Sequence, residues 1–146
     1  MLELTLTLTL TQATFAQGEP INAQVRLRNS GGEAATVNGR LAVNTPYAPE
    51  EMREIAFTLT DPTGALVDFQ VKVNIGAPGD TDFRTLAPGE AIAQSYNLAK
   101  YFALVLPGVY AVQALYQNQS EPEAHSGQGV WKGEVAAPAA TFTVRA

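Results

Sequence analysis

The chain has 146 residues, of which 46% are hydrophobic and 16% are charged, and its formal net charge is −5. This length and composition predict one globular domain, residues 1–146, and the acidic balance with singly scattered basic residues argues against a nucleic-acid partner. The chain has no cysteine, which excludes disulfides, thiolate nucleophiles, cysteine-ligated zinc and iron–sulfur clusters.

The first eleven residues alternate strictly between leucine and polar side chains. Threonine and a single glutamate occupy most of the intervening positions, so the hydrophobic period is two. This pattern predicts a long, half-buried β-strand with its threonines facing water. The face that we expect to be buried consists of Leu2, Leu4, Leu6, Leu8 and Leu10.

Three further strands are predicted in the first half of the chain. Residues 21–28 repeat the alternation, and residues 37–43 form a strand in which Gly39 marks a bulge or a close approach. Residues 55–59 carry the next inward face. Residues 61–64 then form a type I turn, since aspartate and proline occupy its first two positions.

The second half of the chain continues the same alternation. We predict one short helical turn at residues 98–103 and an acidic loop at residues 74–84. The least structured stretch is expected at residues 117–129, which are rich in Gln, Ser, Glu and Gly. Strands are predicted at residues 67–73, 92–98, 110–116, 131–135 and 142–144.

A tyrosine corner is predicted where Leu106-Pro-Gly-Val-Tyr110 enters a strand. Pro107-Gly108 is a turn signal, and Tyr110 stands two residues before the inward-facing Val112. In immunoglobulin-like sandwiches such a tyrosine fills a corner of the core, and its hydroxyl bonds to nearby backbone. Tyr110 is therefore our candidate for the structural corner.

Short strands at regular spacing, with turn signals between them and no long helix, predict an all-β fold. The expected architecture is a single immunoglobulin-like antiparallel β-sandwich of about 7–9 strands. No stretch approaches the ~20 apolar residues of a membrane-spanning helix. The N-terminus also lacks the pattern of a secretory signal, and the absence of cysteine favours the cytoplasm; secretion after removal of a leader stays open.

Two groups of ionisable side chains deserve consideration as metal sites. Glu121, Glu123 and His125, the only histidine, lie in a polar loop without a rigid frame. Asp80 and Asp82 supply too few carboxylates for calcium, which takes about six to eight oxygen ligands. We interpret both groups as solvated loops and expect no metal and no cofactor.

The acidic residues at the loop-to-strand junction form a second kind of candidate. Glu50, Glu51 and Glu54 beside Arg53 could attract a basic partner, but such a charge run is typical of a solvated surface. No serine lies in a nucleophile elbow, and no phosphate-binding, dinucleotide-binding or zinc-protease motif is present. We therefore expect no catalytic residue and no enzymatic activity.

Most aromatic side chains fall on inward faces and are expected in the core. Four aromatic residues are less well placed, namely Tyr47, Tyr101, Phe102 and Trp131. Of these, Trp131 lies between Val130 and Lys132 on a late strand. Tryptophan is a common anchor of protein interfaces, although it also packs on its own sheet. Trp131 is thus a candidate interface residue together with the N-terminal leucines.

Four segments give the chain a resemblance to bacterial immunoglobulin-like modules, namely residues 25–33, 57–64, 85–90 and 106–112. Their order is similar to that of bacterial intracellular proteinase inhibitors and of the β-sandwich pro-regions of deuterolysin-type metalloproteases. The resemblance implies a sandwich fold and a protein partner. It also implies, as an alternative function, protease inhibition through the loops at residues 44–52, 74–84 or 117–129.

We expect a non-enzymatic binding or assembly module with a protein partner, which could be a second copy of the chain. Edge strands are usually protected by lysine, proline, a bulge or shortness, and residues 1–11 have none of these. The strand either closes its own sandwich or pairs with a neighbouring copy. An enzyme with a carboxylate site at Asp80, Asp82 and Glu90 is the competing hypothesis.

Overall fold

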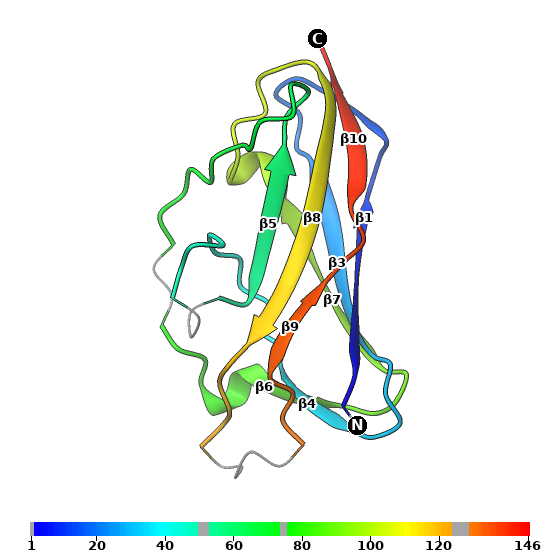
Figure 1. The fold of residues 1–146 in the computed structure, drawn as a ribbon, viewed down its shortest axis with the longest axis vertical. Helices are drawn as coiled ribbons and strands as arrows, with labels where there is room; N and C mark the ends of the chain where they lie inside the picture. Colours follow the sequence, from blue (N-terminus) through cyan, green and yellow to red (C-terminus); the bar gives the residue numbers. More distant parts are fainter. Residues whose placement is uncertain (1, 50–52, 74–75, 124–128) are drawn as a thin grey trace.

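The computed structural model describes residues 2–49, 53–73, 76–123 and 129–146, and it shows two packed β-sheets with a small third sheet at one end (Figure 1). The all-β prediction is confirmed, with ten strands and two short 3-10 turns in the described part. No helix there is long and apolar enough to cross a membrane. The elements are β1 (Leu4–Leu10), β2 (Thr14–Ala16), β3 (Asn22–Asn29), β4 (Ala35–Asn38), β5 (Ile55–Thr60), η2 (Asp80–Asp82), β6 (Phe83–Leu86), β7 (Ala91–Asn97), η3 (Leu98–Lys100), β8 (Gly108–Asn118), β9 (Gly133–Ala136) and β10 (Ala140–Arg145).

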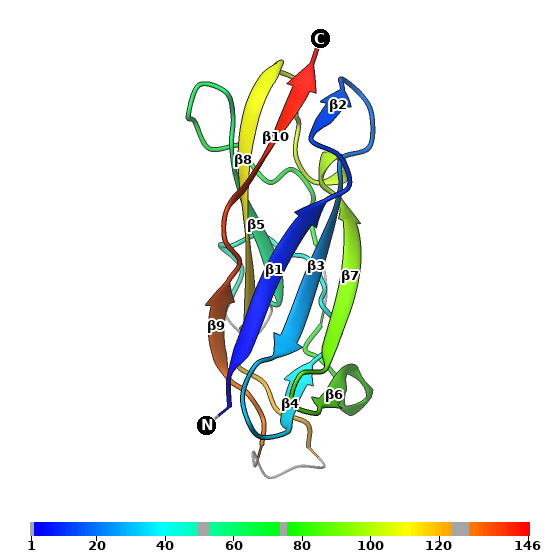
Figure 2. The same ribbon diagram turned by 90° about the vertical axis from the view of Figure 1, so that its right-hand side faces the viewer.

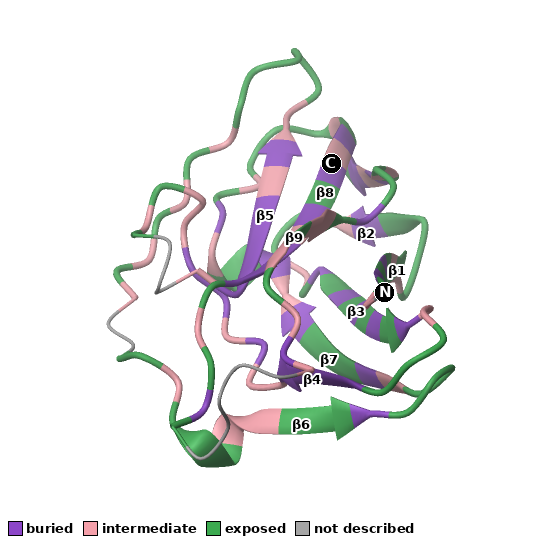
Figure 3. Cartoon of the chain, turned by 60° about the horizontal axis from the view of Figure 1, so that its bottom comes forward, coloured by how far each residue is buried: buried purple, intermediate pink, exposed green. Residues whose placement is uncertain are grey.

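The first sheet contains β1, β3 and β7 in that order, and all its pairs are antiparallel. Leu27 of β3 lies opposite Leu6 on one side and Ile92 on the other. Burial alternates along β3, as the purple and green bands show (Figure 3). The period-two pattern of residues 21–28 therefore places one apolar face of this sheet in the core, as predicted.

The second sheet has the order β2-β10-β8-β5, and β9 also pairs with β8. Both β9 and β10 are antiparallel to β8, with Ala136 opposite Leu115 and Ala140 opposite Val112. The two strands are thus halves of one interrupted strand. Residues 137–139, which include Pro138, separate them, and proline cannot donate a ladder hydrogen bond.

The N-terminal segment changes sheets between its two strands. Whereas β1 is antiparallel to β3 in the first sheet, β2 is parallel to β10 in the second sheet, where Phe15 lies opposite Val144. Ala13 accepts a hydrogen bond from Thr143 N at 2.9 Å. This change of sheet ties the two layers together along one side (Figure 2).

The small third sheet pairs β4 with β6. The sequence pattern did not predict a strand at the position of β6. Asn29 holds this end together. Its fully buried side chain donates to Glu33 O at 2.7 Å and to Leu86 O at 2.9 Å, and it accepts from Gly31 N at 3.0 Å. Buried polar side chains need such partners, so Asn29 links the end of β3 to the loop that follows it and to the end of β6.

The core between the sheets is filled by leucine, isoleucine, valine and aromatic side chains. Tyr110 stacks on Phe142 with ring centroids 5.4 Å apart, and Phe15 meets Phe142 edge-on at 5.9 Å. Phe57 meets Tyr96 edge-on at 5.3 Å. These aromatic pairs join strands of both sheets, so the predicted inward faces meet in one core.

The predicted tyrosine corner is present. Tyr110 is buried, and its hydroxyl donates to Leu106 O at 2.7 Å and accepts from Leu106 N at 3.1 Å. Burial raises the pKa of the Tyr110 hydroxyl, so the group stays protonated and able to donate. The corner closes the turn that leads into β8.

Two predicted strands are wrong or shortened. Residues 67–73 keep their alternating exposure but form only isolated bridges, because no strand lies along them. The strand predicted at 37–43 ends at Asn38, and Leu41 adopts a positive φ of 52°. Gly39 is a close approach, as predicted: an added Cβ would lie 2.9 Å from Arg84 Cδ.

The stretch expected to be least structured begins later than predicted. Gln117 and Asn118 belong to β8 and are buried. Asn118 Nδ2 donates to Ser120 O and to Trp131 O, both at 2.9 Å. Trp131 itself precedes β9, so its predicted place on a strand is wrong. The hydrogen bonds of Asn118 satisfy its polar side chain, which can therefore be buried at the end of β8 although the sequence around it resembles a loop.

Candidate functional site

The outer edge of β1 is the candidate site. In the first sheet β1 pairs only with β3, and among the described residues no other strand pairs with β1. Thr11 N donates to Asn22 O at 3.1 Å, and Ser30 N donates to Glu3 O at 2.9 Å. Odd-numbered residues therefore bond to β3. In an antiparallel pair the bonded positions alternate, so the backbone groups of the even-numbered residues point away from β3.

These even-numbered residues are the leucines, whose side chains face the core of their own sandwich. Leu4 and Leu6 are buried, and Leu2, Leu8 and Leu10 are half-buried against the core. The leucines from Leu4 to Leu10 thus direct their backbone N–H and C=O groups away from β3, while their side chains pack against the core of their own domain. We predicted the N-terminal leucines as interface residues. What they can offer to a partner is their backbone edge rather than their side chains.

The edge carries none of the usual protections. The segment from Leu4 to Leu10 contains only leucine and threonine, without lysine, proline, glycine or a bulge. Its threonines are exposed on the outer face of the sheet, and Thr5 Oγ1 donates to Ser30 Oγ at 2.8 Å. A regular, uncharged edge of this kind is a template for another extended segment.

The neighbouring edge of the second sheet is stepped. At one end β2 lies outside β10, whereas at the other end β9 is the outermost strand. In Figure 2 β1 runs upward from beside β9 towards β2. The strand of the second sheet next to β1 is therefore β9 at the beginning of β1, whereas β2 follows beyond its end.

Trp131 packs within its own domain. Its ring centroid lies 5.5 Å from that of Tyr116, with an angle of 33° between the ring planes. The backbone N–H of Trp131 donates to Thr36 O at 2.9 Å. The side chain is half-buried. Neither contact involves β1, so within the described residues these interactions of Trp131 are separate from the edge formed by the N-terminal leucines.

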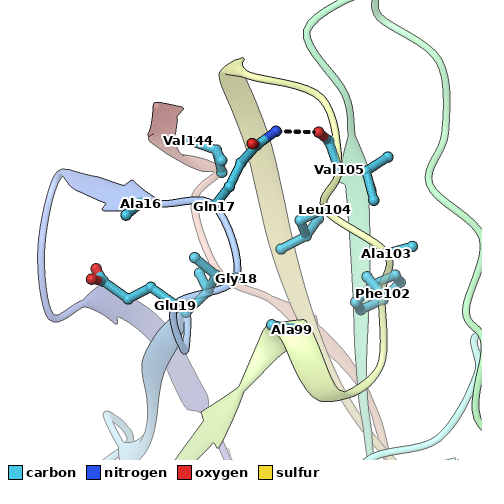
Figure 4. A pocket seen from close by; sticks show the side chains of 11 residues that line it. Ala16, Gln17, Gly18, Glu19, Ala99, Phe102, Ala103, Leu104, Val105 and Val144 are labelled. Atoms are coloured by element: carbon cyan, nitrogen blue, oxygen red, sulfur yellow. Dashed lines mark hydrogen bonds between the residues drawn. The ribbon is translucent and has the colours of Figure 1, made fainter. Parts of the chain in front are cut away.

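An apolar cavity of about 500 Å³ lies between the β2–β3 turn and the segment from η3 to β8 (Figure 4). Ile21, Phe102 and Val144 are buried among its lining residues. Gln17 Nε2 donates across the cavity to Val105 O at 2.6 Å. Among the described residues that line it, Glu19 is the only ionisable one, and most of the others are apolar.

Glu54 is buried, contrary to the prediction of a solvated acidic cluster. Its carboxylate accepts from Arg40 Nε at 2.9 and 3.2 Å, from the Arg40 terminal nitrogen, and from Ala42 N at 3.0 Å. These hydrogen bonds raise the pKa of Arg40 above its ordinary value. The other members of that cluster, Glu50 and Glu51, lie outside the described residues.

Tyrosine hydroxyls brace the backbone beside this ion pair. Tyr96 donates to Leu41 O at 2.5 Å, and Tyr116 donates to Asn38 O at 2.9 Å. Burial raises the pKa of both tyrosines well above the ordinary value, so both remain donors. The ion pair and these bonds hold the turn after β4, which the sequence pattern alone did not reveal.

The residues considered as metal ligands do not converge. Asp80 Oδ1 accepts from Glu123 N at 2.8 Å, and Asp82 Oδ2 accepts from Gly79 N at 2.8 Å. Glu90 Oε1 accepts from Ala87 N at 2.9 Å. In the described ranges no three acidic, histidine or cysteine side chains gather as a metal site.

The second group considered is only partly described. Glu121 pairs with Lys132 at 3.2 Å on the surface, and His125 lies outside the described residues. The loops considered for protease inhibition, residues 44–52, 74–84 and 117–129, each include residues outside the described ranges.

Comparisons with known proteins identify the fold but no family. No family model and no curated protein matches the sequence. The CARDB domain of a Pyrococcus furiosus protein, solved in complex with di-metal ions, matches over 99% of this chain and 94% of that chain, with 12% identity and a TM-score of 0.44. The sporulation control protein Spo0M from Bacillus subtilis matches over 98% of this chain, with 15% identity and a TM-score of 0.50.

Two of these structures are much longer than the present chain. The chain spans 49% of Spo0M and 31% of the Pseudomonas fluorescens alkylpurine DNA glycosylase AlkC, the latter with 14% identity and a TM-score of 0.47. At such identities the likeness shows the β-sandwich fold alone. The resemblance to proteinase inhibitors and deuterolysin pro-regions receives no support from these sequence comparisons.

Proposed function

We propose that the chain is a non-enzymatic β-sandwich module that binds a protein partner by pairing an extended segment with the outer edge of β1. The observation that carries this proposal is the row of outward backbone groups from Leu4 to Leu10 on an unprotected edge strand. Main-chain hydrogen bonds supply affinity in such strand addition. Each contributes about 0.5–1.5 kcal/mol net, so several in a row are needed.

The acidic side chains outside β1 support a structural rather than a catalytic role. Glu54 binds Arg40 in the interior, and Asp61 accepts from Thr63 N, Thr63 Oγ1 and Ala65 N in its turn. Asp82 and Glu90 each accept from backbone N–H groups of their own turns. These hydrogen bonds give each carboxylate a structural role, which supports the proposal of a non-enzymatic module.

Hydrogen exchange on the full chain tests the proposal. When the protein is dilute enough to be monomeric, the backbone N–H groups of Leu6 and Leu8 should exchange quickly because they point away from β3, whereas those of Thr7 and Thr9 should be protected. Addition of a synthetic peptide with the sequence of residues 2–12 should protect the leucine N–H groups. The proposal is wrong if the peptide leaves their exchange unchanged.

A matched pair of variants separates backbone pairing from side-chain packing. Leu8→Ala and Leu8→Pro both remove a half-buried side chain, but only proline also removes the outward N–H. Peptide binding should persist with Leu8→Ala and be lost with Leu8→Pro, provided that circular dichroism shows β-structure in both. Equal binding by the two variants would contradict strand addition.

A further inference from the structure

We propose that the segment that pairs with β1 is β1 of a second copy, antiparallel and related by a two-fold axis through Thr7. This proposal rests on the proposed function of the β1 edge and adds its partner and register. It follows from the order of leucine and threonine and from the direction of the backbone groups.

The alternation of β1 makes the strand complementary to itself. Residues opposite each other in an antiparallel pair point to the same face, so the leucines of both copies stay on the core side only if leucine opposes leucine. Leucines occupy the even positions, and the outward N–H and C=O groups belong to the same positions. Opposed leucines therefore form the hydrogen-bonded pairs. The registers that keep the leucines of both copies on the core side are thus the same registers that bring their outward N–H and C=O groups together.

One of these registers uses the whole strand. With the axis at Thr7, Leu4 lies opposite Leu10 of the second copy and Leu6 lies opposite Leu8, so every residue of β1 is paired. A shift of the axis to Leu6 or Leu8 leaves part of the strand unpaired. The same register places Glu3 opposite Thr11, so the one charged residue of the segment does not meet its own copy.

Antiparallel pairing of β1 brings the β2 end of one copy beside the β9 end of the other, and the first sheets of the two copies then form one continuous sheet. The two-fold axis closes the assembly at two copies, whereas a heterologous pairing would produce a ring or an open filament.

Single cysteines test the register against a clean background, since the chain has no cysteine. Opposed threonines form non-hydrogen-bonded pairs with Cα atoms ~4.5 Å apart, within the range of a disulfide. Under mild oxidation Thr7→Cys should form a dimer of twice the 15.5 kDa chain mass. Thr5→Cys and Thr9→Cys should each form no covalent dimer alone, and they should cross-link to each other when mixed. Ser95→Cys, exposed on β7 of the same sheet, is the matched control.

Each other outcome overturns the proposal in a defined way. Cross-linking of Thr7→Cys no faster than of Ser95→Cys excludes pairing about Thr7. Cross-linking of Thr7→Cys with Thr5→Cys, or with Thr9→Cys, instead places the axis at Leu6 or Leu8. If the parent remains monomeric by sedimentation at all concentrations while the peptide of residues 2–12 still protects the leucine N–H groups, the second copy is excluded and strand addition stands. Absence of both effects removes both proposals.

Discussion

Replacing Arg40 with methionine should lower the free energy of unfolding by about 3–5 kcal/mol, because the change leaves a buried carboxylate without its cation. The Glu54 side chain is 2% exposed and that of Arg40 is 24% exposed. The guanidinium supplies all the hydrogen bonds shown to the Glu54 carboxylate except that from Ala42 N, and it also donates to Gly76 O at 2.9 Å. Methionine fills a similar volume, so the loss reports the charge and its bonds rather than a cavity.

The converse replacement should cost less. Glu54→Gln keeps the shape and the acceptor for Ala42 N, and the partly exposed Arg40 can turn towards water, so we expect a loss of about 1–3 kcal/mol. The double variant Arg40→Met/Glu54→Leu should recover part of the loss, since apolar residues often replace a buried ion pair at little cost. Recovery will be incomplete because Ala42 N then lacks its acceptor.

Urea denaturation of the parent, both single variants and the double variant measures these free energies as a double-mutant cycle. For a chain of this size, the loss in Arg40→Met corresponds to a fall in melting temperature of roughly 10–15 °C. A loss below about 1 kcal/mol, the range of exposed ion pairs, would refute the reasoning. It would mean that water reaches Glu54 in solution and that the pair does not hold the turn after β4.

Other parts of the structure give further predictions. Tyr110→Phe should lower the free energy of unfolding by about 1–3 kcal/mol and Tyr110→Ala by about 3–5 kcal/mol, and melting of both variants within a degree or two of the parent would contradict the corner. Gly108→Ala should destabilise by more than about 1 kcal/mol in urea, because φ is 131° and an added Cβ would lie 2.8 Å from Pro62. Hydrogen bonds, chiefly from the Thr63 hydroxyl, lower the pKa of Asp61, so its contribution is present above the unfolded-state pKa of about 4 and is lost as pH falls through the lower folded-state pKa. The stability difference between parent and Asp61→Asn should therefore shrink on acidification, and a difference independent of pH would count against this assignment. Excess EDTA should leave the melting temperature unchanged; a fall reversed by calcium would restore Asp80 and Asp82 as ligands.

The strands with strict alternation were predictable because burial of one face imposes period two on the sequence. Residues 21–28 and 110–116 correspond to β3 and β8, and their apolar positions are buried as expected. The turn at Asp61 and the corner at Tyr110 were also predictable, since both depend on residues close in sequence. Local chemistry therefore determined which faces are buried and where the chain turns.

The sequence indicated an unprotected N-terminal strand, but only the sheet order shows that its outer edge is free. Whether a strand lies at an edge depends on the positions of all the others, and no local pattern records them. The same reason explains why residues 67–73 alternate without forming a strand: their side chains face inward, but no neighbour offers a continuous ladder.

Buried polar residues were the other feature that only the tertiary structure decided. Glu54 appeared to belong to a solvated charge run, and nothing in the sequence pattern marked Asn29 as buried, yet both are buried and hydrogen-bonded to residues brought near by the fold. Hydrophobic patterns report which apolar groups leave water. They do not report which polar groups follow them, because a charge or an amide is buried only where partners distant in sequence converge on it.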